Sequence, residues 1–356
     1  MFETLLMSAL VGGEIGQYRF VDNFDVPKCR PDTVLCKVRA VALNPFDAKM
    51  ADYSANPGAV GGSDFSGDVV EVGEHVSRFQ VGDRIFAMAF GLNPSDSGSG
   101  AFAEYALAIA DVACKIPDGM SYEEASSTGF SLGTAGAALF RMLELPLPKL
   151  EDRKMTNGNT QVLVSGGATS TGTIAIQLLK LAGFVPIATC SPENMELVKS
   201  RGAAETFDYH SPSCGTEIRS RTNNSLAFAL DCVTTPSTMK MCYEAIGSSG
   251  GKYIALDTFP PAIQYTRRDV KADWLMVYTL LGAPVELAGV CGRPGSATSR
   301  EFAAKLFSLA EGLLERRALQ NHPIERRSGK LHNLIDGIED LRMGVVRGKK
   351  LVYTIV

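Results

Sequence analysis

The sequence predicts an α/β protein in which a β-rich part precedes a part built around a parallel sheet. From Leu5 to about Asp111, short apolar segments alternate with turns that contain glycine and proline, a pattern typical of strands. From Gln161 onward, short apolar strands alternate with helical patterns of roughly ten residues. This alternation indicates βαβ units and therefore a parallel sheet.

Size and charge exclude several classes of protein. The chain has 356 residues, a formal net charge of −4 and 45% hydrophobic residues, and at ~100–200 residues per domain it predicts two or three domains. A balanced charge excludes nucleic-acid binding by bulk positive charge, and no apolar run reaches the ~18 residues of a membrane helix. Residues 1–10 have no preceding basic residue and make a poor signal peptide. We therefore expect a cytoplasmic protein with no nucleic-acid or membrane partner.

Cysteine and histidine give no metal signature. The eight cysteines contain no C-x-x-C pair, and the four histidines show none of the spacings of a zinc site. We expect free thiols in a reducing compartment and no bound metal, although distant residues could still form a site.

Individual elements follow from local patterns in the first part. Residues 34–43 and 68–72 read as strands. Ser121, with Glu124 three residues later, predicts a capping box at the start of a helical region that continues over residues 134–145.

Residues 145–161 are rich in proline, then in charge, and predict a linker. After it we expect helices over residues 173–182 and 191–201, then over 299–319 and 331–343. Strands are expected at 162–164, 185–190, 205–209, 226–233, 252–256 and 350–356. We predict a first domain that begins with residues 1–160, a nucleotide domain of residues 161–298, and a return segment of residues 299–356 that completes the first.

A glycine-rich turn joins the strand at 162–164 to the following helix. It contains Gly166, Gly167 and Gly172 and lies within a βαβ unit, which makes the signal stronger than an isolated glycine motif. A helix N-terminus presents backbone N–H groups and a positive dipole end, which match the pyrophosphate of a dinucleotide. A tight turn without a ligand is the alternative.

The end of the next strand favours NADPH over NADH. A carboxylate usually closes this strand in proteins that bind the unphosphorylated cofactor, whereas this chain has Cys190 and Ser191. Small polar groups leave room for a 2′-phosphate, to which Ser191 and Asn194 can donate, while Lys199 or Arg201 adds charge. Ser191 also fits an N-cap before a proline. The predicted cofactor residues of this region are Ser191, Pro192, Glu193, Asn194 and Tyr209, the last of which is equally well explained by packing at a strand end.

Five motifs together carry a resemblance to a known superfamily. They are Ala42–Lys49 (ALNPFDAK), Gly62–Gly73 (GSDFSGDVVEVG), Phe79–Arg84 (FQVGDR), Ala101–Tyr105 (AFAEY) and Ile116–Ser121 (IPDGMS). With them the chain resembles the medium-chain dehydrogenases/reductases, in the zinc-free branch of quinone and enoyl reductases. The resemblance implies a Rossmann parallel-sheet nucleotide domain plus a GroES-like β-rich catalytic domain. Where zinc alcohol dehydrogenases carry G-H-E, this chain has Gly62-Ser63-Asp64, so the position of the zinc histidine is a serine.

A narrower resemblance is to the trans-acting enoyl reductases of fungal polyketide synthases, the lovastatin enoyl reductase group. It rests on Leu132–Gly136 (LGTAG), Thr189–Pro192 (TCSP), Lys199–Ala203 (KSRGA), Ala229–Cys232 (ALDC) and Gly292–Ser296 (GRPGS). The quinone-reductase pattern has glycine where this chain has Thr169, which weakens the generic quinone-reductase reading more than it weakens cofactor binding.

The resemblance implies reduction of an α,β-unsaturated thioester, carried by the carrier-protein domain of a polyketide synthase, with NADPH as the cofactor. By position it places cofactor contacts at Phe46, Asp47, Ala48 and Lys49, at Ala168, Thr169, Ser170 and Thr171, at Leu256 and Asp257, and, most weakly, at Val346 and Arg347. Lys49 and Thr134 are the predicted catalytic residues, because a cation or a hydroxyl can stabilise the enolate oxygen. Thr134 and the apolar residues Phe130, Val277, Tyr278, Thr279, Leu280 and Leu281 are candidates for the substrate channel, with plain core packing as the alternative for the apolar ones. No residue stands out as the proton donor: Tyr105, Asp64 and solvent are all conceivable.

Two other functions stay open. A soluble NADPH quinone or alkenal reductase would act on diffusible substrates, and a dinucleotide-binding protein without turnover would act as an interaction partner. We also expect a monomer, because Pro260, Pro261 and Pro284 interrupt the stretch in which some relatives pair edge strands.

Overall fold

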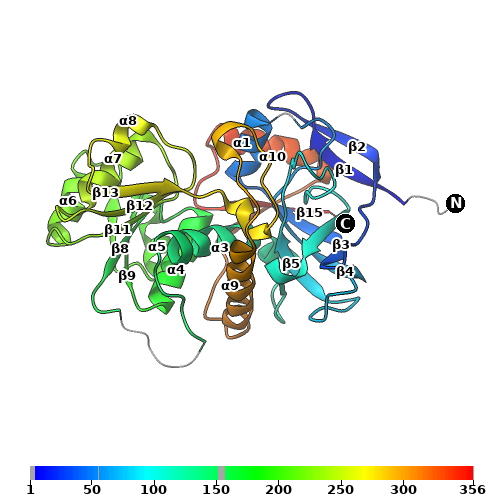
Figure 1. Cartoon of the computed structure of the whole chain (residues 1–356), viewed down its shortest axis with the longest axis horizontal. Coiled ribbons are helices and arrows are strands. Elements are labelled where there is room, and N and C mark those ends of the chain that lie inside the picture. Colours follow the sequence, from blue (N-terminus) through cyan, green and yellow to red (C-terminus); the bar gives the residue numbers. More distant parts are fainter. Residues whose placement is uncertain (1–4, 55, 151–156, 356) are drawn as a thin grey trace. The chain divides into compact units, whose positions relative to one another are not determined.

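The computed structural model describes residues 5–54, 56–150 and 157–355, so part of the predicted linker lies outside the described residues. The chain forms two compact units. Unit 1 consists of Met1–Gly133 with Tyr278–Val356, and unit 2 consists of Thr134–Val277. Figure 1 shows the course of the chain through both units.

Unit 1 is built around a sheet with the strand order β14-β15-β3-β4-β5-β7, in which β6 also pairs with β3. β14 and β15 run parallel, and the other pairs in this sheet are antiparallel. β1 (Leu6–Gly12) and β2 (Tyr18–Asp25) form a separate antiparallel pair. The sheet strands are β3 (Thr33–Ala42), β4 (Asp64–Val72), β5 (Arg84–Met88), β6 (Tyr105–Ile109), β7 (Ala113–Lys115), β14 (Ile324–Arg327) and β15 (Lys350–Thr354).

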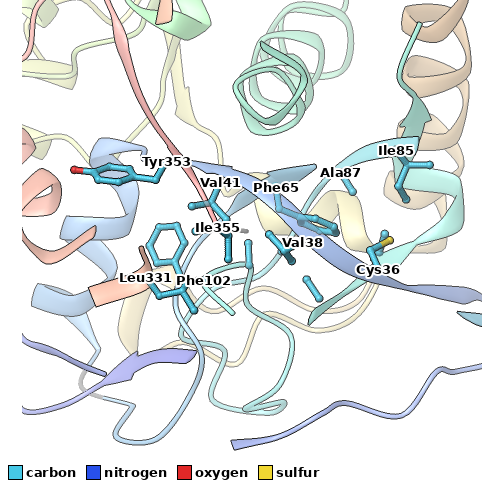
Figure 2. Close-up of a cluster of buried hydrophobic side chains, with 14 of the residues drawn as sticks. Cys36, Val38, Val41, Phe65, Ile85, Ala87, Phe102, Leu331, Tyr353 and Ile355 are labelled. Atoms are coloured by element: carbon cyan, nitrogen blue, oxygen red, sulfur yellow. The ribbon is translucent and has the colours of Figure 1, made fainter. Parts of the chain in front are cut away.

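Apolar side chains from both chain segments of unit 1 form one core. Figure 2 shows Val38 and Val41 of β3 with Phe65 of β4 and Tyr353 of β15. Full burial of a large apolar side chain stabilises the fold by about 1.5–3 kcal/mol. The core therefore ties the C-terminal segment to the N-terminal sheet.

The helices of unit 1 include one that begins at a signal visible in the sequence. Ser121 caps α2, its Oγ accepting from the N–H of Glu124 while Glu124 accepts from the N–H of Ser121, which confirms the predicted capping box. The helices are α1 (Pro45–Tyr53), α2 (Tyr122–Ser126), α3 (Gly129–Gly136), α9 (Ala297–Glu315) and α10 (Leu334–Arg342), with short 3-10 turns at Ala110–Val112, Val277–Leu281, Gly289–Cys291 and Leu331–Asn333.

Unit 2 contains a wholly parallel sheet with the strand order β10-β9-β8-β11-β12-β13. Counted within the unit, this is the order 3-2-1-4-5-6 of a doubly wound dinucleotide-binding fold. The strands are β8 (Gln161–Ser165), β9 (Val185–Cys190), β10 (Glu205–Asp208), β11 (Phe228–Asp231), β12 (Gly251–Ala255) and β13 (Val270–Trp274). The helices are α4 (Ser170–Leu181), α5 (Met195–Ser200), α6 (Cys214–Arg221), α7 (Pro236–Ala245) and α8 (Pro261–Gln264), with a 3-10 turn at Pro192–Asn194 and a π-helical stretch at Ala137–Met142.

The structure corrects several predicted elements. The helix expected over 191–201 is divided into a 3-10 turn and α5, and the segment expected as one helix over 134–145 passes from α3 into π-helical backbone. Sequence analysis missed β13 and β14, and it named no helix at the positions of α6, α7 and α8. β13 lies beyond Pro260 and Pro261, which are at the start of α8, and before Pro284. The prolines therefore do not interrupt this edge strand, and the argument from them for a monomer is wrong.

The chain passes from unit 1 to unit 2 within α3 and returns between Val277 and Tyr278. Both crossings precede the boundaries predicted at 160/161 and 298/299. Because compact contacts and functional domains need not change at the same residue, those domain boundaries stay a prediction. Within the described residues, no helix has the length and apolar character needed to cross a bilayer.

Candidate active site

The predicted glycine turn connects β8 to α4 in unit 2. Gly166 has φ +78°, in the region that favours glycine. A Cβ atom added at Gly172 would lie 2.3 Å from the carbonyl oxygen of Gly166, so the turn is closed too tightly for a side chain there. The helix that follows is 12 residues long and directs its first N–H groups toward the turn. This arrangement fits the pyrophosphate of a dinucleotide.

Thr169 has a structural task in this turn. It is the N-cap of α4: its Oγ1 accepts from the N–H of Gly172 at 3.0 Å and donates to the carbonyl oxygen of Gly166 at 2.8 Å. Where the quinone-reductase pattern has a flexible glycine, this chain has a threonine whose hydroxyl fixes the turn with two hydrogen bonds. This cap also explains why α4 begins before the predicted residue 173. Ala168, Thr169, Ser170 and Thr171 are all half-buried.

The predicted adenosine end of the site follows β9 and β10. Ser191 is the N-cap of the turn that begins with Pro192, as predicted, and its Oγ accepts from the Nδ2 of Asn194 at 3.0 Å. Asp208 lies beside Cys190 in the sheet register and accepts from the N–H and the Nδ1 atom of His210. Sequence analysis did not single out this carboxylate. Pro192 and Glu193 are exposed, and Tyr209, 44% exposed, has its ring centroid 4.1 Å from that of His210.

The other predicted cofactor residues are placed in each unit separately. Leu256 follows β12 in unit 2, where its N–H donates to Thr234 Oγ1 at 3.1 Å, and Asp257 is half-buried beside it. Val346 and Arg347 are in the loop before β15 in unit 1, where Val346 packs against the core and Arg347 is exposed. Their roles toward a cofactor stay predictions.

In unit 1, the predicted residues Phe46, Asp47, Ala48 and Lys49 lie in the first turns of α1. Phe46 and Lys49 are half-buried and, three residues apart, share a face of the helix. Asp47 and Ala48 are buried. Asp47 accepts from the backbone N–H of Asn44 at 2.7 Å, so its side chain caps the helix from within.

A buried chain of hydrogen bonds joins three segments at α1. The hydroxyls of Tyr278 and Ser63 lie 2.9 Å apart, and Ser63 Oγ donates to Asp47 Oδ1 at 2.7 Å. The hydroxyl of Tyr18 donates to the backbone carbonyl of Asp47 at 2.8 Å. Burial raises the pKa of Asp47 to about 7, against the lowering effect of the hydrogen bonds from Ser63 and Asn44. Ser63 is thus a hydrogen-bonding centre at the position where zinc dehydrogenases have histidine.

An aromatic cluster surrounds this chain. Tyr278 stacks on Phe90 with ring centroids 3.8 Å apart, and it lies 5.5 Å from Phe46 and 6.1 Å from Phe130. Phe46 and Phe130 also stack on each other. Thr134 follows Phe130 by four residues on α3, on the same face of that helix, and is buried. Of the other channel candidates, Val277, Leu280 and Leu281 are buried and Thr279 is half-buried.

A buried ion pair lies next to this cluster. Lys350 Nζ donates to Asp64 Oδ2 at 2.5 Å and to the carbonyl of Ser127 at 3.1 Å. Asp64 also accepts from Asn44 Nδ2 at 3.0 Å and from the N–H of Phe130 at 2.6 Å. Burial raises the pKa of Asp64, while Lys350 opposes this. Both carboxylate oxygens are engaged, which argues against Asp64 as the proton donor.

Asp47 makes the stability of unit 1 depend on pH. Because the folded pKa is raised, the carboxyl keeps its proton between pH 4 and 7 in the folded state and loses it in the unfolded state. We expect this group to reduce the free energy of unfolding by up to about 4 kcal/mol as pH rises through that window. Asp47→Asn removes this titration. Urea unfolding should therefore show that, between pH 4.5 and pH 7.5, the wild type loses stability relative to the variant. Equal pH dependence in both proteins would contradict the assignment.

The titratable residues offer no obvious metal site. Within the described ranges, no group of three or more His, Cys, Asp or Glu side chains could hold a metal ion. The buried thiols of Cys36, Cys114, Cys190, Cys214 and Cys242 are not in disulfide bonds. Independence from zinc stays a prediction.

Sequence analysis missed Lys350, Asn44, Tyr18 and Phe90 as members of the network and the cluster. Lys350 and Asp64 are 286 residues apart, and nothing local to either marks the pair. Ser63 was noticed only because of the resemblance, and its hydrogen bonds become visible only when β4, α1 and Val277–Leu281 are brought together.

Comparisons with known proteins agree with this geometry. Residues 30–118 match the alcohol dehydrogenase GroES-like domain, and residues 170–260 match the zinc-binding dehydrogenase family model. A quinone oxidoreductase of Pseudomonas syringae has the same fold, with TM-score 0.72 and 20% identity over 98% of this chain and 100% of that one. The CurK enoyl reductase gives TM-score 0.75 and 17% identity over 98% and 99% of the two chains. The protein is an oxidoreductase of the medium-chain dehydrogenase/reductase superfamily, a class that implies a nicotinamide cofactor.

Relatives of higher identity define the family more narrowly. A trans-enoyl reductase of Gibberella fujikuroi is 53% identical over 348 residues, which cover 98% of this chain and 99% of the relative. A trans-enoyl reductase of a Penicillium species is 51% identical over 98% of both chains. The chain belongs to the trans-enoyl reductase family.

Proposed function

We propose that the protein is a trans-acting, NADPH-dependent enoyl reductase of secondary metabolism, in the cytoplasm. It reduces the α,β-double bond of polyketide thioesters held by the carrier-protein domain of a polyketide synthase. The observation that carries this proposal is the similarity to trans-enoyl reductases over 98% of the chain. The intact glycine turn and the Lys49-bearing α1 support it.

Different residues of the protein bind the cofactor and stabilise the developing charge. When bound, the reduced nicotinamide supplies the hydride for the β-carbon of the substrate. The turn at Gly166–Gly172 and the N-terminus of α4 would hold its pyrophosphate. Lys49 and Thr134 are the proposed catalytic residues: an ammonium or a hydroxyl that donates to the thioester oxygen stabilises the negative charge that develops there. With Asp64 engaged by Lys350, solvent supplies the proton for the α-carbon.

Preference for NADPH rests on the end of β9. Ser191 and Asn194 provide polar groups without a carboxylate on that strand, and the nearby Asp208 is directed to His210. We expect Ser191→Asp to reduce the preference for NADPH over NADH at least about tenfold, because a carboxylate repels the 2′-phosphate. The ratio of kcat/KM for the two cofactors measures this. Ser200→Asp, on the exposed end of α5, is the matched control.

We propose that the enzyme is a monomer, for a reason different from the prolines. β13 is the edge strand of its sheet, and its exposed Lys271 and Asp273 are charges that disfavour pairing with a second edge. A dimer mass in light scattering would overturn this.

Substrate comparison tests the function. Purified protein with NADPH is given a crotonyl thioester of a carrier domain, a crotonyl thioester of N-acetylcysteamine, and a small quinone. We expect turnover of the thioesters, fastest on the carrier, and a loss of about 10²-fold in kcat for Lys49→Met. Turnover of the quinone alone would establish the soluble quinone reductase instead. Binding of NADPH without any turnover would favour the non-catalytic interaction protein.

A further inference from the structure

We propose that Tyr278 is a positioning residue that, through Ser63, fixes Asp47 and thereby the first turns of α1, which carry Lys49. This inference rests on the proposed function, because it is that function which gives Lys49 its role at the thioester. Nothing in the sequence connects Tyr278 to α1.

The first argument is the connectivity of the hydrogen bonds. Ser63 Oγ donates its proton to Asp47 Oδ1, so it can only accept from the hydroxyl of Tyr278. Asp47 uses its other oxygen for the backbone N–H of Asn44, directly before α1. Donation along this series of hydrogen bonds therefore runs in one direction, from the phenol of Tyr278 through Ser63 to the carboxylate of Asp47 at the start of α1.

The second argument is burial. Tyr278 is 1%, Ser63 0% and Asp47 1% exposed, so water does not replace these bonds when one is removed. A buried polar group that loses its partner keeps its desolvation cost. Removing any one of these hydrogen bonds therefore destabilises the arrangement of the three residues. The segments joined in this way are the 3-10 turn at Val277–Leu281, the residue before β4, and α1.

The third argument is that the ring of Tyr278 contacts the same helix. The ring lies 5.5 Å from Phe46 and stacks on Phe90. Phe46 shares a face of α1 with Lys49. Tyr278 thus holds α1 at two points: the hydroxyl reaches Asp47 through Ser63, and the ring packs against Phe46.

Two variants test the proposal. Tyr278→Phe keeps the ring and removes the hydroxyl, and Ser63→Ala breaks the chain at its centre. Tyr122→Phe is the matched control, because the hydroxyl of Tyr122 donates to the carboxylate of Asp68 on β4, in the same unit. For both test variants we expect faster amide hydrogen exchange in residues 44–53 and a kcat with carrier-bound crotonyl thioester lowered about tenfold. The control should show neither change.

A pH profile separates positioning from general stability. Asp47 is faced by Ser63 and Asn44, by Asp64 and Lys350, and by the hydroxyl-bearing rings of Tyr18 and Tyr278. We expect kcat to rise as Asp47 ionises. The midpoint should move to higher pH in Ser63→Ala, because the hydrogen bond from Ser63 lowers the pKa of Asp47. A role in stability alone would lower the melting temperature and leave this midpoint in place.

The outcomes distinguish this proposal from the proposed function. Exchange in residues 44–53 needs no substrate: unchanged exchange in both variants overturns the positioning role, even if the enzyme reduces thioesters. Faster exchange with unchanged kcat overturns it as well. If the wild type reduces no thioester, the proposed function fails, and faster exchange in the variants would still support the link from Tyr278 to α1.

Discussion

Lys350→Met will lower the free energy of unfolding by about 3–5 kcal/mol, the cost of leaving one member of a buried ion pair without its partner. Lys350 and Asp64 are 4% and 0% exposed, so solvent does not compensate the remaining carboxylate. The loss will be largest at neutral pH, where Asp64 must either stay charged or take up a proton. Urea unfolding followed by far-UV circular dichroism measures this loss of stability.

Two further variants isolate the cause. Asp64→Asn combined with Lys350→Met removes both charges and should recover most of the loss, since neither partner remains uncompensated. Lys240→Met breaks an exposed pair with Glu244 at 3.8 Å and should cost less than about 1 kcal/mol. Equal losses in the single and the double variant would show that packing, not charge, causes the effect.

Gly172→Ala will weaken the affinity for NADPH at least about tenfold. The added Cβ would lie 2.3 Å from the carbonyl oxygen of Gly166, so the turn must open at the point proposed to bind the pyrophosphate. The hydrogen bond from the N–H of Gly172 to Thr169 would be disturbed by the same movement. Titration of NADPH fluorescence gives the Kd directly.

The matched control is Gly98→Ala in unit 1. There the added Cβ would meet the Cβ of Pro27 at 3.4 Å, an ordinary contact, and the backbone does not have a positive φ. This variant should bind NADPH like the wild type. An unchanged Kd in Gly172→Ala would mean that the turn does not hold the cofactor.

Local pattern was sufficient for most of unit 2. β9 was predicted with its observed bounds, Val185–Cys190, because a short apolar run between turns admits few other structures. β13 and β14 were missed because Lys271, Asp273 and the arginines of Ile324–Arg327 obscure any apolar pattern. Edge strands need little burial, so their sequences carry little signal.

The candidate site also has parts that the local sequence predicts and parts that it does not. The glycine turn has a local signature and was predicted from residues alone. The chain from Tyr278 to Asp47 and the pair of Lys350 with Asp64 have none, since their members are brought together only by the tertiary fold. Lys49 and Thr134 are an intermediate case. The resemblance to a known family named them as catalytic, and the structure places them on α1 and α3.

The order in which the chain is synthesised gives the divided unit 1 a consequence for folding. Unit 2 is one continuous stretch, Thr134–Val277, and can fold as soon as it has left the ribosome. Unit 1 must wait for β14 and β15, and until Lys350 arrives Asp64 has no cation beside it. During that interval β3 has an open edge where β15 will pair, and such an edge can pair with another chain until β15 covers it.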